Sequence, residues 1–72
     1  LYPNPASNFV TLKSTSEIIL VSLFDINGRL IRQYKNPGST EFSFNGLPNP
    51  GLYVIQVQTN AGTEFKKLLI QN

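Results

Sequence analysis

The chain of 72 residues contains no cysteine, no histidine and no tryptophan. Without cysteine there is no disulfide or thiolate metal site to stabilise a small fold. Without histidine, the commonest general base and metal ligand is missing. A chain of this length makes one domain, close to the lower limit at which a hydrophobic core supports folding unaided. We therefore expect a single domain over residues 1–72 that holds no cofactor and no metal.

Charge and long apolar runs are also scarce. Charged residues make up 14% of the chain, with six basic and four acidic side chains. Apart from Lys66 and Lys67 the basic residues are dispersed, whereas a nucleic-acid surface shows a denser stripe, so no nucleic-acid partner is expected. No apolar run approaches the ~20 residues that a membrane span needs. Leu1 is not a natural initiator and no signal peptide follows it, so we expect a fragment or processed product, with any secretory signal upstream.

The hydrophobic residues, 40% of the chain, alternate with polar ones in short segments. Strands are predicted over residues 9–13, 18–25, 30–34, 41–45, 52–59 and 63–70. Proline or glycine interrupts every long window, which excludes long helices. Short strands at this spacing predict an all-β antiparallel sandwich of six strands. The entry segment 1–8, held extended by Pro3 and Pro5, is a candidate for a seventh.

The predicted strand 18–25 carries apolar side chains on both faces. Ile19, Val21 and Leu23 are predicted on one face, with Leu20 and Phe24 on the other. A strand that is apolar on both faces is usually central in its sheet or covered on its outer side. We expect this strand to be central or to be covered on its outer side.

Residues 25–29 form the strongest turn signal in the chain. Gly28, and to a lesser degree Asn27, tolerate the positive φ of tight hairpins, and Asp25 can accept N–H bonds within the turn. A two-residue loop pairs Ile26 with Arg29, whereas a three-residue loop with a glycine bulge pairs Asp25 with Arg29. The second register is favoured because it places opposite charges across the hairpin.

The favoured register also sets Leu23 opposite Ile31. Further along the chain, Phe42 and Phe44 share one face of their strand. Tyr53, Ile55 and Val57 share one face of the strand 52–59, and all five are expected in the core. Leu47, the only large apolar side chain of the loop 46–51, is predicted to plug one end of that core. Gly51→Val would disrupt the fold if Gly51 needs positive φ.

Catalytic chemistry is not indicated. Glu17, Asp25, Glu41 and Glu64 lie in four different segments, as solvated surface acids do. The serines have no histidine to activate them, and no Ser–Lys pair stands out. Asp25 and Asn27 lack the further oxygen ligands of a calcium loop. An enzyme is therefore not expected.

Four short motifs, taken in order and at these spacings, resemble the C-terminal sorting domain of the type IX secretion system of Bacteroidetes. They are Tyr2-Pro3-Asn4-Pro5-Ala6; Val21-Ser22-Leu23-Phe24-Asp25 with Gly28-Arg29-Leu30-Ile31; Pro50-Gly51-Leu52-Tyr53-Val54 after Leu47; and Lys67-Leu68-Leu69-Ile70. Each motif alone is an ordinary turn or strand edge. The resemblance implies an immunoglobulin-like sandwich of about seven strands, which agrees with the pattern of alternation.

The resemblance also implies a function. The domain would end a larger exported protein, be recognised in the periplasm, and direct a covalently linked cargo through an outer-membrane translocon. A surface sortase would then commonly remove it by cutting upstream of Leu1, leaving the cargo at the cell surface or secreted. Translocon and sortase components are the partners implied.

Two groups of residues follow from this comparison. Asp25, Gly28, Arg29, Leu47, Gly51 and Tyr53 are interpreted as requirements of the sandwich. The sorting-signal candidates are Pro3, Asn4, Pro5, Ala6, Lys66, Lys67, Leu68, Leu69 and Ile70. Two other functions stay open: a passive immunoglobulin-like spacer or adhesive module, and a small carbohydrate-binding domain, the latter weakened by the absence of tryptophan.

Overall fold

A computed structural model describes residues 8–35 and 38–71. This part of the chain contains no helix and six strands: β1 (Phe9–Lys13), β2 (Ile18–Asp25), β3 (Leu30–Lys35), β4 (Glu41–Asn45), β5 (Gly51–Thr59) and β6 (Gly62–Ile70). The all-β prediction is confirmed. Three strands are one residue longer than predicted, since β3 ends at Lys35, β5 begins at Gly51 and β6 begins at Gly62. The candidate seventh strand, the entry segment 1–8, lies outside the described residues except for Asn8, which belongs to no strand.

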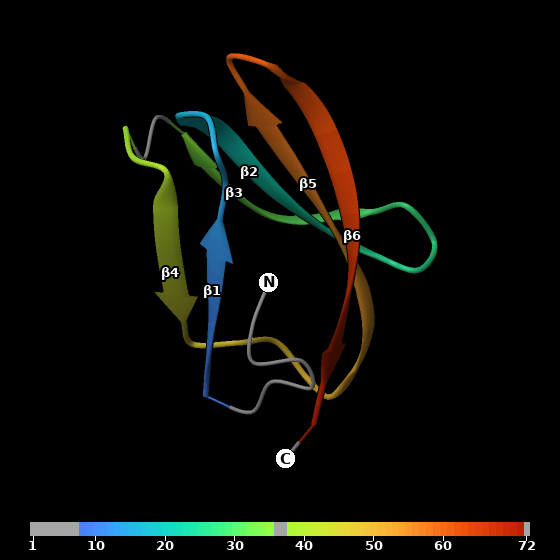
Figure 1. The fold of residues 1–72 in the computed structure, drawn as a ribbon. Coiled ribbons are helices and arrows are strands. Elements are labelled where there is room, and N and C mark those ends of the chain that lie inside the picture. Colours follow the sequence, from blue (N-terminus) through green and yellow to red (C-terminus); the bar gives the residue numbers. More distant parts are fainter. Residues whose placement is uncertain (1–7, 36–37, 72) are drawn as a thin grey trace.

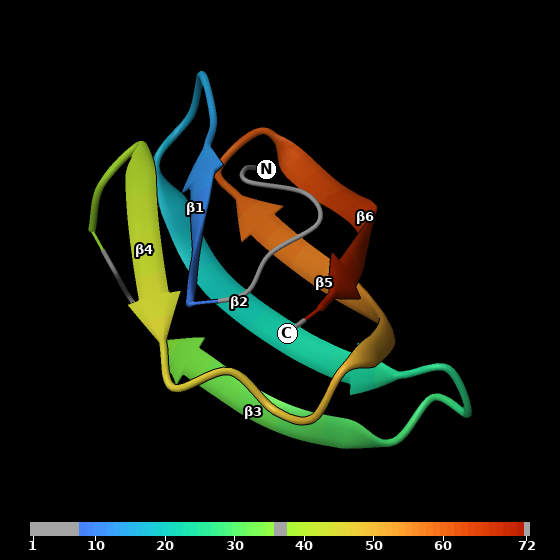
Figure 2. The same cartoon turned by 90° about the horizontal axis from the view of Figure 1, so that it is seen from below.

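The strands form two antiparallel sheets. One contains β1 and β4, and the other has the order β3-β2-β5-β6. Figure 1 shows the β1–β4 pair beside the longer, curved strands of the larger sheet, and Figure 2 shows the same pair on one side of that sheet from below. The strand β2 lies between β3 and β5, so of the two alternatives for this strand the structure shows the central position.

The core lies between the sheets because alternate side chains of every strand point inward. Its buried members are Val10, Leu12, Ile18, Val21, Leu23, Phe44, Ile55, Val57, Leu68 and Ile70. Phe42, Tyr53 and Leu47 are half-buried against this cluster, as predicted. Both sheets therefore contribute to a single apolar core, whose burial is the main force holding a chain of this size folded.

A bulge shifts the alternation at the start of β2. Ile18 pairs with Thr59 and Leu20 with Gln58, so the register slips between them. As a result Ile18 is buried at 1% exposure, while Ile19 is only half-buried and lies outside the buried cluster. The prediction that Ile19 shares the core face of Val21 is wrong, because a bulge inserts one residue and reverses the faces on its far side.

A second irregularity lies in the β2–β3 hairpin. Phe24 pairs with Leu30, but Leu23 pairs with Arg32. The expected pairing of Leu23 with Ile31 is therefore wrong, since Ile31 is the extra residue of the bulged strand. The consequence is that Arg32 takes a position opposite a core leucine and reaches the neighbouring sheet.

Aromatic contacts connect the two sheets. The ring centroid of Tyr34 in β3 lies 5.1 Å from that of Phe42 and 5.2 Å from that of Phe44, both in β4. Separations of this size suit tilted aromatic pairs. Within the small sheet, Thr11 and Ser43 share a side-chain hydrogen bond of 2.8 Å. The β4 strand is thus fixed both to β1 and to the edge of the larger sheet.

Candidate functional site

The final strand, β6, is an edge of the larger sheet among the described strands. It pairs with β5 along its whole length, from Gly62 opposite Thr59 to Ile70 opposite Gly51. The side chains of Leu68 and Ile70 are buried at 0% and 2% exposure. The sorting-signal candidates at 68 and 70 therefore complete the core, so their replacement would disturb the fold as well as any recognition.

The two lysines of β6 lie on opposite faces. Lys66 pairs with the core residue Ile55, and Lys67 pairs with Val54 on the outer face. The side chain of Lys66 is half-exposed and its Nζ lies 3.2 Å from a carboxylate oxygen of Glu64. The two lysines thus form no joint basic cluster. Lys67 is the exposed cation that this strand presents on the outer face of the sheet.

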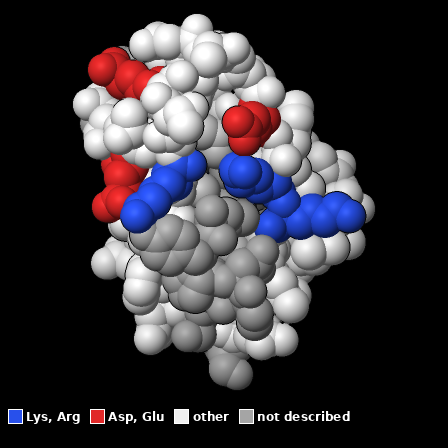
Figure 3. Space-filling model, viewed as in Figure 1, with Lys and Arg blue, Asp and Glu red and all other residues white. Residues whose placement is uncertain are grey.

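The basic residues visible from one side of the molecule are spread out. In Figure 3 they form a loose band across the middle of this face, with acidic side chains next to part of the band. Lys13 lies 3.5 Å from Glu41, and both side chains are more than half exposed. Exposed pairs of this kind contribute little to stability.

The β2–β3 turn has the geometry of the favoured register. The carbonyl of Asp25 accepts the N–H of Gly28, and the N–H of Asp25 donates to the carbonyl of Arg29, both at 3.0 Å. Gly28 has φ +84°, the left-handed conformation that a three-residue loop with a glycine bulge requires. The predicted pairing of Asp25 with Arg29 is confirmed.

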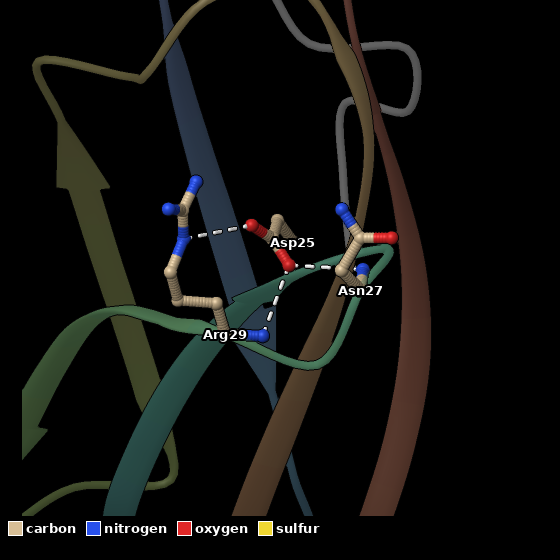
Figure 4. A network of polar contacts seen from close by, with 3 residues as sticks. All are labelled: Asp25, Asn27 and Arg29. Carbon is tan, nitrogen blue, oxygen red and sulfur yellow. Dashed lines mark hydrogen bonds and ion pairs between the residues drawn. The ribbon is translucent and has the colours of Figure 1, made fainter.

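The Asp25 carboxylate organises this turn (Figure 4). Its Oδ1 accepts the backbone N–H groups of Asn27 and Arg29, each at 2.9 Å, and its Oδ2 lies 3.1 Å from the Nε of Arg29. The N–H of Arg29 has the largest effect and lowers the pKa of this carboxyl; desolvation opposes it, and the N–H of Asn27 and the Arg29 side chain lower the pKa further. The group stabilises a turn, and nothing in its surroundings suggests catalysis.

Gly51 and Tyr53 fix the start of β5. Gly51 has φ +154°, in the range that favours glycine. The hydroxyl of Tyr53 donates a 2.6 Å hydrogen bond to the carbonyl of Asn49, across the loop that precedes the strand. Both residues thus shape the entry of the chain into β5. The candidates Pro3, Asn4, Pro5 and Ala6 lie outside the described residues.

Arg32 has a role that the alternation pattern did not indicate. Its guanidinium donates to the carbonyl of Asn45 at 3.1 Å and also to the carbonyl of Gly46. It thereby ties the end of β4 to β3, across the two sheets. Only the bulge at Ile31 aims Arg32 in this direction, and no residue type in the sequence marks that bulge.

Phe65 is the other residue missed. It lies in β6 with 67% of its surface exposed, opposite Gln56 on the outer face of the sheet. Alternate residues of a strand lie on the same face, so the spacing of Phe65, Lys67 and Leu69 in the sequence could have predicted its place on the outer face. The described residues contain no group of three or more acidic side chains that could hold a metal ion. They also contain no helix long and apolar enough to cross a membrane.

The described residues form a small β-sandwich with one apolar core, and β6 lies at the edge of its larger sheet. The family model described as "Secretion system C-terminal sorting domain" matches residues 1–71. The chain belongs to this family, the C-terminal sorting domains of type IX secretion. No curated protein and no solved structure matches the chain significantly.

Membership in the family identifies the chain as a sorting signal attached to a cargo protein and used by the type IX machinery. Its destination is the cell surface or the medium, beyond the outer membrane. The family is one of signals and not of enzymes. Of the candidate signal residues in the described part, Lys66, Lys67, Leu68, Leu69 and Ile70 form one continuous half of β6.

Proposed function

We propose that this domain is read in the periplasm as a folded signal, directs its cargo through the outer-membrane translocon, and is then removed by a surface sortase that cuts N-terminal to residue 1. The observation that carries the proposal is the match of the sorting-domain family over residues 1–71. The sandwich supports it, since the described residues offer a folded surface and no cluster of catalytic side chains.

The recognised element is the final strand. In the sheet order no described strand lies beyond β6, and a strand at a sheet edge can be extended by a strand from a partner. Leu68 and Ile70 anchor β6 in the core, which keeps its edge in a fixed geometry. Lys67 and Leu69 project from the outer face and supply side chains by which a partner can distinguish this edge from others.

A charge reversal at Lys67 tests the role of β6 without removing a side chain from the core. A reporter fused upstream of residues 1–72 is expressed in a bacterium that has a type IX system, as the wild type, as Lys67→Glu and as Lys35→Glu. Lys35 is the matched control, because it is also exposed and lies on β3, the opposite edge of the same sheet. We expect Lys67→Glu to lower export about tenfold or more, with the reporter accumulating in the periplasm, while Lys35→Glu is exported as the wild type is.

Circular dichroism of each purified domain confirms that the variants fold. If a folded Lys67→Glu variant is exported as well as the wild type, β6 is not part of the signal. Removal of the domain is followed by intact mass. The exported product is expected to lack residues 1–72, and a product that retains them would favour a passive module of a surface protein instead.

A further inference from the structure

The chain contains two Asn–Gly pairs, Asn27–Gly28 and Asn45–Gly46. Asparagine is chemically labile in such a pair, because the amide nitrogen of the next residue can attack the side-chain carbonyl carbon. Glycine has no side chain to obstruct that nitrogen. The attack occurs within one chain, so its rate depends on whether the structure leaves the nitrogen available. The two pairs differ in this respect.

The Asn27–Gly28 pair is held inside the β2–β3 turn. The N–H of Gly28 donates a 3.0 Å hydrogen bond to the carbonyl of Asp25, and the N–H of Asn27 donates to the Asp25 carboxylate at 2.9 Å (Figure 4). The Gly28 nitrogen can attack only after its own hydrogen bond breaks and the turn opens. Loss of a backbone hydrogen bond before reaction slows the attack about fivefold to tenfold.

The Asn45–Gly46 pair lies where β4 ends and the loop to β5 begins, and both residues are exposed. None of the hydrogen bonds between described residues uses the N–H of Gly46. Gly46 has φ +59°, and the nearest neighbour of a Cβ added there is the Arg32 guanidinium, 4.0 Å away. The Gly46 nitrogen is therefore available without the opening of a turn.

Arg32 contacts the amide group that has to react. One nitrogen of its guanidinium donates to the carbonyl oxygen of Asn45 at 3.1 Å, and the other donates to the carbonyl of Gly46. The carbonyl of Asn45 and the N–H of Gly46 belong to the same amide, whose nitrogen becomes nucleophilic as it loses its proton. A guanidinium keeps its positive charge at all ordinary pH values, so it stabilises the negative charge that develops on this amide.

We infer that Asn45 is a site of spontaneous modification, in which Arg32 promotes the closure of a succinimide ring. The nitrogen of Gly46 forms a bond to Cγ of Asn45, and the bond from Cγ to the side-chain nitrogen breaks. Ammonia leaves with the proton that the Gly46 nitrogen gives up. Water then adds to one of the two ring carbonyls and reopens the ring, which restores the N–H of Gly46 and leaves a carboxylate. This chemistry goes beyond the sorting function and does not depend on it.

Arg32 also biases the product. Water that adds at Cγ gives aspartate, whereas water that adds at the main-chain carbonyl of residue 45 gives isoaspartate. The guanidinium donates to the oxygen of that main-chain carbonyl, so it favours addition there and stays beside the carboxylate that forms. The backbone of isoaspartate runs through the side-chain carbons, which displaces Gly46 from Arg32. The modified chain should therefore have a lower thermal midpoint than the unmodified one.

The first test compares the two asparagines within one sample. The folded chain is kept in mildly alkaline buffer, samples are digested with trypsin, and tandem mass spectrometry follows each site. Trypsin cuts after lysine and arginine, so Asn27 and Asn45 end in different peptides. We expect Asn45 to react about tenfold faster than Asn27, or more. In urea, where neither pair is held, the two rates should converge. Equal rates in the folded chain, or faster reaction of Asn27, would overturn the inference.

The second test changes Arg32, and the sign of the effect decides its role. In Arg32→Gln, which loses the charge, we expect the reaction at Asn45 to slow about tenfold while Asn27 keeps its rate. If Arg32 only held the loop rigid, its loss would speed the reaction at Asn45. An unchanged or faster rate in the folded variant would thus contradict the role of Arg32.

Circular dichroism shows whether Arg32→Gln is folded. If it unfolds, Arg32→Lys takes its place, since lysine keeps the charge but cannot donate in the same two directions. Its rate at residue 45 is expected to lie below that of the wild type, and an equal or higher rate would contradict the role of Arg32. Asn45→Gln is the control for assignment of the site, because the longer side chain closes a ring far more slowly.

The third test measures the products at residue 45. Chromatography of the tryptic peptides separates isoaspartate from aspartate. The share of isoaspartate should be higher in the folded wild type than in the urea-unfolded chain, and it should fall in the folded Arg32 variant. Equal shares in all three samples would show that Arg32 does not direct the opening of the ring.

Discussion

At the scale of single residues, Asp25 shows how one carboxylate can define a hairpin. Three donors converge on it from two residues of the same turn, and Gly28 supplies the left-handed backbone that brings them together. Because the signal for this turn is local, the sequence predicted both the loop length and the pairing of Asp25 with Arg29. Local turn chemistry of this kind depends on no distant contact.

The lowered pKa of Asp25 predicts an acid-dependent stability. Folding favours the ionised carboxylate, so its contribution is complete above the ordinary pKa of 3.8 and is lost as the pH falls through the lower folded-state pKa. Thermal midpoints measured by circular dichroism between neutral and strongly acidic pH should therefore fall less steeply for Asp25→Asn than for the wild type. Asn27→Ala, which keeps the backbone N–H and the carboxylate, should retain the wild-type profile. Parallel profiles for wild type and Asp25→Asn would contradict this assignment.

At the scale of the element, the strands differ in how far alternation predicts their contacts. β4 and β5 follow strict alternation, and Phe44, Ile55 and Val57 are buried as the pattern indicates. In β2 and β3 the pattern fails at two points, Ile19 and Ile31, because each lies at a bulge that reverses the faces. Bulges arise from pairing between strands, and the residue types at these positions do not predict them.

The start of β5 provides a test of backbone strain. Gly51 has φ +154°, and an added Cβ would meet Tyr53 only at 3.7 Å, an ordinary contact. Gly51→Val is therefore expected to destabilise through its backbone conformation and not through a clash, by about 1–3 kcal/mol. Leu52→Val, the neighbouring exposed position in the same strand, should cost much less. Urea unfolding measures both, and equal midpoints would show that the Gly51 conformation stores no strain.

At the scale of the whole molecule, one apolar core supports both sheets. Leu23→Ala removes a fully buried side chain and should cost about 2–5 kcal/mol. A domain of 72 residues has a total stability of only about 4–11 kcal/mol, so this variant should be partly or wholly unfolded. Leu30→Ala, at 48% exposure on the outer face, should change the stability by about 0.5 kcal/mol or less. Chemical denaturation measures the free energy of unfolding of both variants. Similar losses for the two would show that Leu23 is not a core residue.

The fold class, all six described strands and most of the core could be predicted from the sequence, because period-two alternation determines which side chains are buried. The candidate site was predicted only in part. The alternation indicated that Leu68 and Ile70 anchor β6, but the separation of Lys66 from Lys67 and the exposure of Phe65 become meaningful only in the assembled sheet. Residues that are neighbours on a sheet face come from different strands, and they are not neighbours in the sequence.

The burial of Leu68 and Ile70 has a consequence for the synthesis of the precursor. A ribosome makes these residues at the end of the last described strand, and until they emerge the core between the sheets is incomplete. A cargo protein whose translation stops early, even after all of its own sequence is made, thus carries no folded sorting domain. Under the proposed function, selection of complete chains for export would follow from the order in which the sandwich is completed.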